Sequence, residues 1–155
     1  FEIESEQPIW RIPGDRMKMK DFHLVPLSRQ VIVLLEQIRE ISGDGKLLFP
    51  SEKNPNQAMS YNTMLFALYR MGYHSRITVH GFRSLFSTYA NEKGRFRPDV
   101  IERQLAHAPR DKVRGAYNHA EYLEERRELL QWWSDHLENF RTPGKVIDFQ
   151  SRKAG

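Results

Sequence analysis

Cysteine is absent from the 155 residues of this chain. Disulfide bonds, thiolate nucleophiles and cysteine-based zinc sites are therefore excluded. The lack of disulfide bonds fits a protein of the cytoplasm. Long apolar runs are missing too: a run such as Val31–Leu35 is far too short to cross a bilayer. No signal-peptide pattern opens the chain. We therefore expect a cytoplasmic protein without a membrane partner.

A strong excess of one charge is also missing, with 24 Lys and Arg against 20 Asp and Glu, a formal net charge of +4 and a pI near 9.4. Any affinity for DNA must then come from local clusters of basic residues and not from bulk charge. The sequence contains three such clusters: Arg11, Arg16, Lys18 and Lys20; Arg95 and Arg97; and Arg110, Lys112 and Arg114.

The apolar pattern predicts one mainly α domain with a small antiparallel β-sheet near the N-terminus. Residues 8–13 and 23–27 have the pattern of two strands joined by a basic turn, and Ser28 is a typical N-cap for the helix that follows. A second helix is expected after Ser60, with an inward-facing stripe of Tyr61, Met64, Leu65 and Leu68.

Three further helices are expected in the second half of the chain. One follows His80 and carries Phe82, Leu85, Phe86 and Tyr89 at helical spacing. Another begins at Pro98 and Asp99, which suit a first helical turn, and ends at His107. The last carries Leu123, Leu130, Trp133 and Leu137 as its buried row.

The most informative stretch runs from His80 to Tyr117. It contains His80-Gly81-Phe82-Arg83, then Leu105-Ala106-His107, then Tyr117 ten residues later. An arginine matches the oxygens of a phosphate, a histidine donates or relays a proton near neutral pH, and a tyrosine hydroxyl serves as a covalent nucleophile when activated. His80 and Arg83 are three residues apart and therefore share one face of a helix. Together these residue types can process a phosphodiester without a metal.

This order and spacing resembles the C-terminal signature of the tyrosine recombinases, or phage integrases. The sequence around the tyrosine, Ala116-Tyr117-Asn118-His119-Ala120, resembles that of the prophage integrase branch of the family. The resemblance runs from Trp10 to about Leu137. It implies a bacterial or phage-encoded protein that carries out site-specific DNA recombination, the integration or excision of a mobile element.

The resemblance also implies the roles of single residues. Tyr117 would attack the scissile phosphate and form a 3′-phosphotyrosyl intermediate, and Arg83 would hold the non-bridging oxygens. His80 and His107 would bind the phosphate and manage the tyrosine proton. Lys18, on the turn between the strands, would protonate the departing 5′-oxygen, with Lys20 as the competing candidate. No cofactor and no metal site are expected.

Double-stranded DNA carrying attachment sites is the expected partner, with Arg76, Arg110 and Lys112 as DNA-binding residues. The full-length protein is expected to self-associate into a tetramer on DNA.

One departure from the family pattern concerns a second arginine. The family supplies it from a Thr-Gly-x-Arg-like segment ahead of the hairpin, and nothing like that segment precedes Trp10. We expect residues 1–142 to form a partial catalytic domain without its first helices, and residues 143–155 to form a C-terminal tail. The fragment itself is expected to be inactive.

Two other classes of protein remain open at this stage. A non-catalytic helical DNA-binding module explains the basic clusters but not the histidine pair. A metal-independent phosphodiesterase would use His80 and His107 as acid and base, and Tyr117 would then be incidental.

Overall fold

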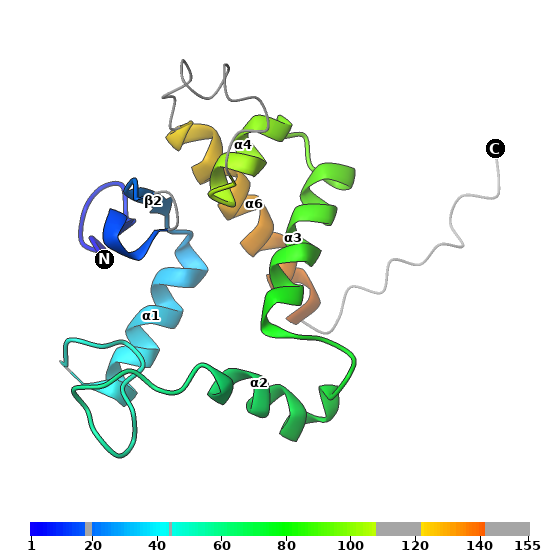
Figure 1. Cartoon of the computed structure of the whole chain (residues 1–155). Helices are drawn as coiled ribbons and strands as arrows, with labels where there is room; N and C mark the ends of the chain where they lie inside the picture. The colour runs from blue at the N-terminus through cyan, green and yellow to red at the C-terminus, as the bar shows by residue number, and fades with distance from the viewer. Residues whose placement is uncertain (18–19, 44, 108–121, 142–155) are drawn as a thin grey trace.

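The computed structural model describes residues 1–17, 20–43, 45–107 and 122–141. It is mainly helical with one two-stranded antiparallel sheet near the N-terminus, which confirms the predicted fold class (Figure 1). The elements are β1 (Ile9–Ile12), η1 (Gly14–Arg16), β2 (His23–Pro26), α1 (Arg29–Ser42), α2 (Asn62–Leu68), η2 (Tyr69–Tyr73), α3 (Val79–Lys93), α4 (Pro98–Gln104) and α6 (Leu123–Arg141). None of the helices in these ranges is both long enough and apolar enough for a membrane span.

The two predicted strands pair in the register Ile9 with Pro26 and Ile12 with His23. The turn that joins them closes tightly over Gly14, where an added Cβ would lie 2.1 Å from the carbonyl oxygen of Lys20. Only glycine fits so close to another backbone. Lys20 itself has a φ of 63°, in the left-handed region. The backbone on either side of residues 18–19 is thus constrained by packing.

Ser28 caps α1 as predicted, because its hydroxyl accepts a hydrogen bond from the Val31 amide at 3.4 Å. The same hydroxyl lies 2.7 Å from the Ser134 hydroxyl of α6. The cap therefore fixes both the start of α1 and its contact with α6. Gly43, with a φ of 72°, ends the helix.

The hydrophobic core lies where α3, α4 and α6 meet. Its buried members are Phe86, Ala90, Val100, Ile101, Leu105 and Leu129. Trp132 and Trp133 of α6 pack against this cluster, as their apolar character predicts, and the Trp133 ring contacts Phe86 edge-to-face at 5.5 Å between centroids. Pro98 stands in the first turn of α4, and Val100 and Ile101 point from that helix into the core.

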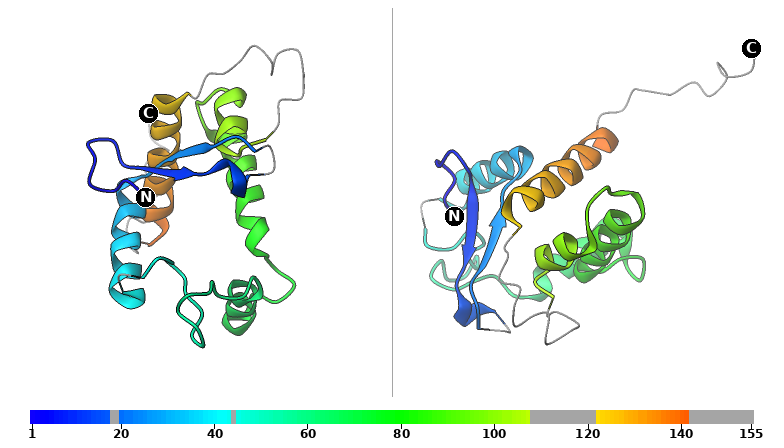
Figure 2. Two further views of the ribbon diagram at one scale, coloured as in Figure 1. Left: turned by 60° about the vertical axis from the view of Figure 1, so that its left-hand side comes forward. Right: turned by 90° about the horizontal axis from the view of Figure 1, so that it is seen from above.

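Helix α6 is the central element, because it packs against β2, α1 and α4 (Figure 2). Its most unusual buried residue is Arg126, whose exposed fraction is 0%. The Nε atom of Arg126 donates to Gln104 Oε1 at 2.9 Å, and its Nη2 donates to the Leu24 carbonyl. One guanidinium thus connects the sheet, α4 and α6.

The expected inward stripe of α2 is wrong at two of its four positions. Leu68 is buried, but Tyr61 is fully exposed and Met64 is 42% exposed. On α3, Phe82 and Leu85 are likewise half exposed, although Phe86 is buried. An apolar stripe becomes core only where a second layer covers it. Within the described residues α2 packs mainly against η2, its own continuation, at the opposite end of the molecule from α4 (Figure 1).

Replacing Arg126 with methionine, which fills a similar volume, should destabilise the protein. The Leu24 carbonyl and the Gln104 amide would lose a buried donor, which costs roughly 1–3 kcal/mol for each unsatisfied group. Urea unfolding measures the effect. Arg141→Met, on the exposed end of the same helix, is the matched control, and equal midpoints for the two variants would contradict the proposed role of Arg126.

Candidate functional site

His80 and Arg83 stand in the first turns of α3. Thr78 caps this helix, because its hydroxyl accepts a hydrogen bond from the Gly81 amide at 3.1 Å. Both candidate side chains are exposed. The Nη2 atom of Arg83 donates to the carbonyl of Leu105, at the end of α4. This bond anchors one corner of the guanidinium, which has further donors in the same plane.

The end of α4 has a cap of the Schellman type. The Ala106 amide donates to the Arg103 carbonyl at 3.0 Å, and the His107 amide donates to the Glu102 carbonyl at 3.1 Å. Ala106 has a φ of 51°, the left-handed conformation that such a cap requires and that usually falls to glycine. The chain therefore turns sharply at Ala106 and brings His107 back over the last turn of the helix.

Three side chains from three other elements bind this same helix end. His23 of β2, which is 5% exposed, donates from Nε2 to the Gln104 carbonyl at 3.3 Å. Arg83 of α3 binds the Leu105 carbonyl, and Arg126 of α6 binds the Gln104 side chain. Cationic groups are favourable at the carboxyl end of a helix, where unpaired carbonyls concentrate negative potential. We call residues 102–107 together with these three side chains the α4 end.

His107 is exposed at the α4 end and is oriented by a carboxylate. Its Nδ1 atom lies 2.7 Å from Glu102 Oε2. The exposed fractions of the two side chains are 44% and 42%. The printed contact uses Nδ1, and the other ring nitrogen, Nε2, takes no part in it.

The structure therefore brings Arg83 to the turn that carries His107, and it places His80 one helical turn before Arg83. Lys18, Tyr117, Arg110 and Lys112 lie outside the described residues. Lys20 is exposed beside the hairpin turn, and Arg76 is exposed with its guanidinium carbon 5.9 Å from the Tyr73 ring centroid. The roles assigned to these residues remain predictions.

Sequence reasoning missed Glu102, Arg126 and His23. Glu102 is five residues before His107, a spacing at which side chains on a regular helix do not meet. Only a left-handed residue at Ala106 brings them together. Arg126 belongs to a highly charged stretch, Glu124–Glu128, in which composition alone suggests solvent exposure. Burial of His23 could be predicted more readily than burial of Arg126, because the residues around His23 have the pattern of a half-buried strand.

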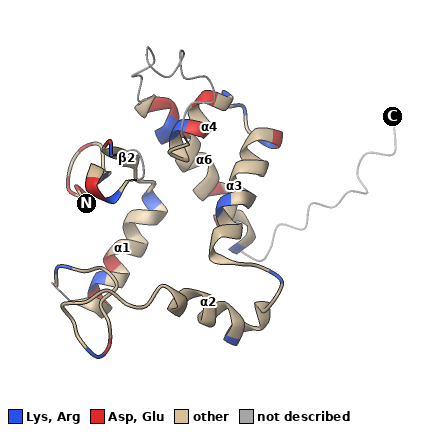
Figure 3. Ribbon diagram, in the orientation of Figure 1, with Lys and Arg blue, Asp and Glu red and all other residues tan. Residues whose placement is uncertain are grey.

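Charges of both signs adjoin near α4 and the start of α6, whereas α2 carries none (Figure 3). Arg97, from one of the basic clusters, is paired with Glu125 through two hydrogen bonds of 3.1 and 2.5 Å. The bond to Glu125 raises the pKa of Arg97 above its usual value. This pairing partly neutralises that cluster as a DNA-binding surface.

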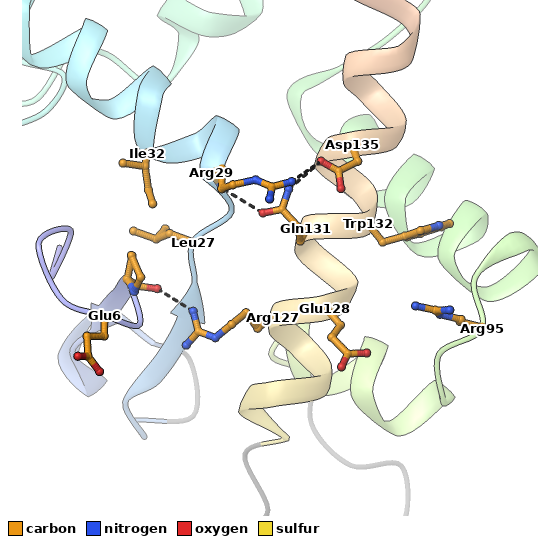
Figure 4. Close-up of a pocket in the computed structure, with 11 residues that line it drawn as sticks. Glu6, Leu27, Arg29, Ile32, Arg95, Arg127, Glu128, Gln131, Trp132 and Asp135 are labelled. Atoms are coloured by element: carbon orange, nitrogen blue, oxygen red, sulfur yellow. Dashed lines mark hydrogen bonds and ion pairs between the residues drawn. The ribbon is translucent and has the colours of Figure 1, made fainter.

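An open pocket of about 620 Å³ lies between the segment that precedes β1, the start of α1 and α6 (Figure 4). Arg29, Arg127 and Asp135 are among the residues that line it, and Gln30 donates to Asp135 Oδ1 at 2.7 Å. This hydrogen bond is the main cause that lowers the pKa of Asp135. The pocket is separate from the candidate site, because neither His80, Arg83 nor His107 lines it.

Among the described residues, no group of three or more His, Asp or Glu side chains is arranged to hold a metal ion. Arg83 and His107 at the α4 end are residue types suited to binding a phosphate directly.

A helical domain that presents an arginine and a histidine beside one helix end is suited to phosphodiester chemistry. Comparison with known families agrees with this class. Residues 2–124 match the Phage integrase family. The chain therefore belongs to the phage integrase family and corresponds to the catalytic domain of the tyrosine recombinases.

Curated relatives are integrases of phages and prophages. An integrase of Enterobacteria phage P4 is 44% identical over 152 residues, covering 88% of this chain and 35% of the relative. The prophage integrase IntA of Escherichia coli is 46% identical over 134 residues, covering 86% and 32%. An integrase of Shigella phage Sf6 is 39% identical over 137 residues, covering 88% and 35%. The chain thus spans about a third of the length of these relatives. No solved structure matches the chain significantly.

Proposed function

We propose that this chain carries the strand-cleaving chemistry of a site-specific DNA recombinase that integrates or excises a mobile element. The observation that supports it most is the bond from Arg83 to the Leu105 carbonyl, two residues before His107. Arg83 and His107 belong to two separate family motifs, and the fold brings these motifs together. Membership of the phage integrase family supplies the reaction type.

In the proposed reaction the Tyr117 hydroxyl attacks the scissile phosphorus. A bond from the tyrosine oxygen to phosphorus forms as the bond to the 5′-oxygen breaks, which leaves a 3′-phosphotyrosyl linkage. Arg83 binds the non-bridging oxygens and stabilises their growing charge. His80 and His107 hydrogen-bond the phosphate and accept the tyrosine proton, while Lys18 gives a proton to the departing 5′-oxygen. Because the phosphodiester energy is kept in the covalent linkage, the reverse step rejoins DNA.

Double-stranded DNA with attachment sites is the proposed substrate, bound through Arg76, Arg110 and Lys112. Exchange between two duplexes cuts four strands, and each cut consumes one tyrosine. This count favours a tetramer of the full-length protein on DNA.

The proposed domain division is a partial catalytic domain over residues 1–142 and a tail over residues 143–155.

Tyr117→Phe tests the proposed nucleophile in the protein expressed from its full coding sequence. The substitution removes only the hydroxyl oxygen, so DNA binding should persist while the covalent adduct disappears. Reaction with a nicked suicide duplex, followed by a denaturing gel, measures the covalent protein–DNA adduct. A mobility-shift assay measures DNA binding. An adduct that persists in the variant would move the nucleophile to another residue, with Tyr122 the first to examine. Cleavage without any adduct would favour a phosphodiesterase, and binding without cleavage a DNA-binding module.

Residues 1–155 alone should bind DNA weakly and form little or no adduct. Residues 1–9 contain no segment like the family's first arginine motif, and loss of a preorganised donor to the phosphate costs about a hundredfold or more in rate. Residues 1–155 should also make fewer phosphate contacts than the protein from the full coding sequence. Their weak DNA binding should be strongly dependent on salt. The measurement compares adduct formation by residues 1–155 and by the full coding sequence at equal low salt. Similar yields would show that the second arginine is dispensable.

A further inference from the structure

Glu102 contacts His107 at two points. The Glu102 carbonyl accepts the His107 amide at 3.1 Å, and the Glu102 carboxylate binds Nδ1 of the imidazole at 2.7 Å. Backbone and side chain of one residue therefore hold backbone and side chain of the other. Such a double contact leaves His107 little freedom to rotate.

The cap of α4 produces this arrangement. Residues five apart do not face each other on a regular helix. Here the left-handed Ala106 reverses the chain, and the hydrogen bond to the Glu102 carbonyl sets His107 directly over Glu102. Arg83 and Arg126 then fix the helix end that carries the cap. The position of the His107 imidazole is therefore set by the cap of α4 and by the side chains that hold this helix end.

The chemistry of the two groups fixes the tautomer. A carboxylate has no proton to donate, so the hydrogen in the 2.7 Å contact must belong to Nδ1. Nε2 is then the second polar atom of the ring. It accepts a proton when the ring is neutral and donates a hydrogen bond when the ring is charged. In both states the same nitrogen meets the substrate.

We propose that Glu102 is a positioning residue for DNA cleavage: it holds His107 in the Nδ1–H tautomer and presents Nε2 to the scissile phosphodiester. The inference rests on the proposed function, in which His107 contacts the phosphate and the tyrosine proton. As a contact between two exposed side chains it adds little to stability. The contact acts by orienting the ring. In the other tautomer Nε2 carries the proton, so a neutral ring could not accept a proton at Nε2.

The first experiment uses Glu102→Gln in the protein expressed from its full coding sequence. Glutamine has the same size but can also donate to Nδ1, which permits the wrong tautomer. We expect the rate of adduct formation on a nicked duplex, at saturating DNA, to fall at least about tenfold, part of the 10²–10⁴-fold that a positioned acid or base contributes. Glu92→Gln, an exposed site on α3, removes the same charge and should leave the rate unchanged.

DNA affinity separates this role from simple electrostatics. Both variants lose one negative charge, so their affinity for DNA should be equal to or tighter than that of the wild type. A slower reaction with undiminished binding is expected only if Glu102 acts in the chemical step. Equal rates for Glu102→Gln and the wild type would overturn the inference.

A double-mutant cycle asks whether Glu102 acts through His107. In a His107→Ala background, Glu102→Gln should cause no further loss of rate. A similar loss in both backgrounds would show that Glu102 acts elsewhere and would overturn the inference.

Nitrogen NMR of selectively labelled histidine tests the inference without reference to activity. His107 should carry its proton on Nδ1 in the wild type, and the Nε2–H tautomer should gain population in Glu102→Ala. The same tautomer population in both proteins would overturn the inference. A wild-type protein that forms no adduct would instead refute the proposed function, and the tautomer measurement would still show whether Glu102 sets the tautomer of His107.

Discussion

The carboxyl end of α4 is the constraint on which the candidate site depends. The last carbonyls of a helix have no partner within it and must be satisfied by other groups. In this chain the cap at Ala106 satisfies two of them, and His23 and Arg83 bind the carbonyls of the next two residues. The unpaired carbonyls of one short helix thus draw together β2 and α3, and Arg126 of α6 joins them through the Gln104 side chain.

This arrangement gives Arg83 two tasks. One nitrogen of its guanidinium holds the fold together at the Leu105 carbonyl, and the other donors of the same rigid plane are oriented as a consequence. A lysine could not do both, because its single ammonium group has no fixed plane. His107 is placed by the same helix end through the cap and through Glu102. Preorganised donors of this kind are what stabilises charge in a transition state.

Much of the fold could be predicted from local signals. The cap at Ser28, the start of α4 at Pro98 and the pairing of the two strands follow from the chemistry of single residues and from alternation. Which apolar residues are buried could be predicted less well, because burial depends on what covers each face. Tyr61 and Phe82 satisfy the helical period and are nevertheless exposed, whereas Val100 and Ile101 lie between packed helices and are buried.

The candidate site shows the same division. His80, Arg83 and His107 could be selected because their type, order and spacing resemble the motifs of the phage integrase family. Their supporting residues could not, since a buried Arg126 and a Glu102 under His107 arise from tertiary contacts between segments that are distant in sequence or joined by a left-handed residue. A helix cap at Leu105-Ala106-His107 is the local feature that could have suggested Glu102 as the partner of His107.

The central claim is that the α4 end presents Arg83 and His107 to one phosphate. The most direct measurement is an experimental structure of the protein, expressed from its full coding sequence, trapped on a nicked duplex that carries its cleavage site. The account predicts that the guanidinium of Arg83 and Nε2 of His107 both lie within hydrogen-bonding distance of oxygens on the scissile phosphate, with the contact from Glu102 to Nδ1 retained. Arg83 and His107 bound to different phosphates, or His107 turned away from the DNA, would contradict it.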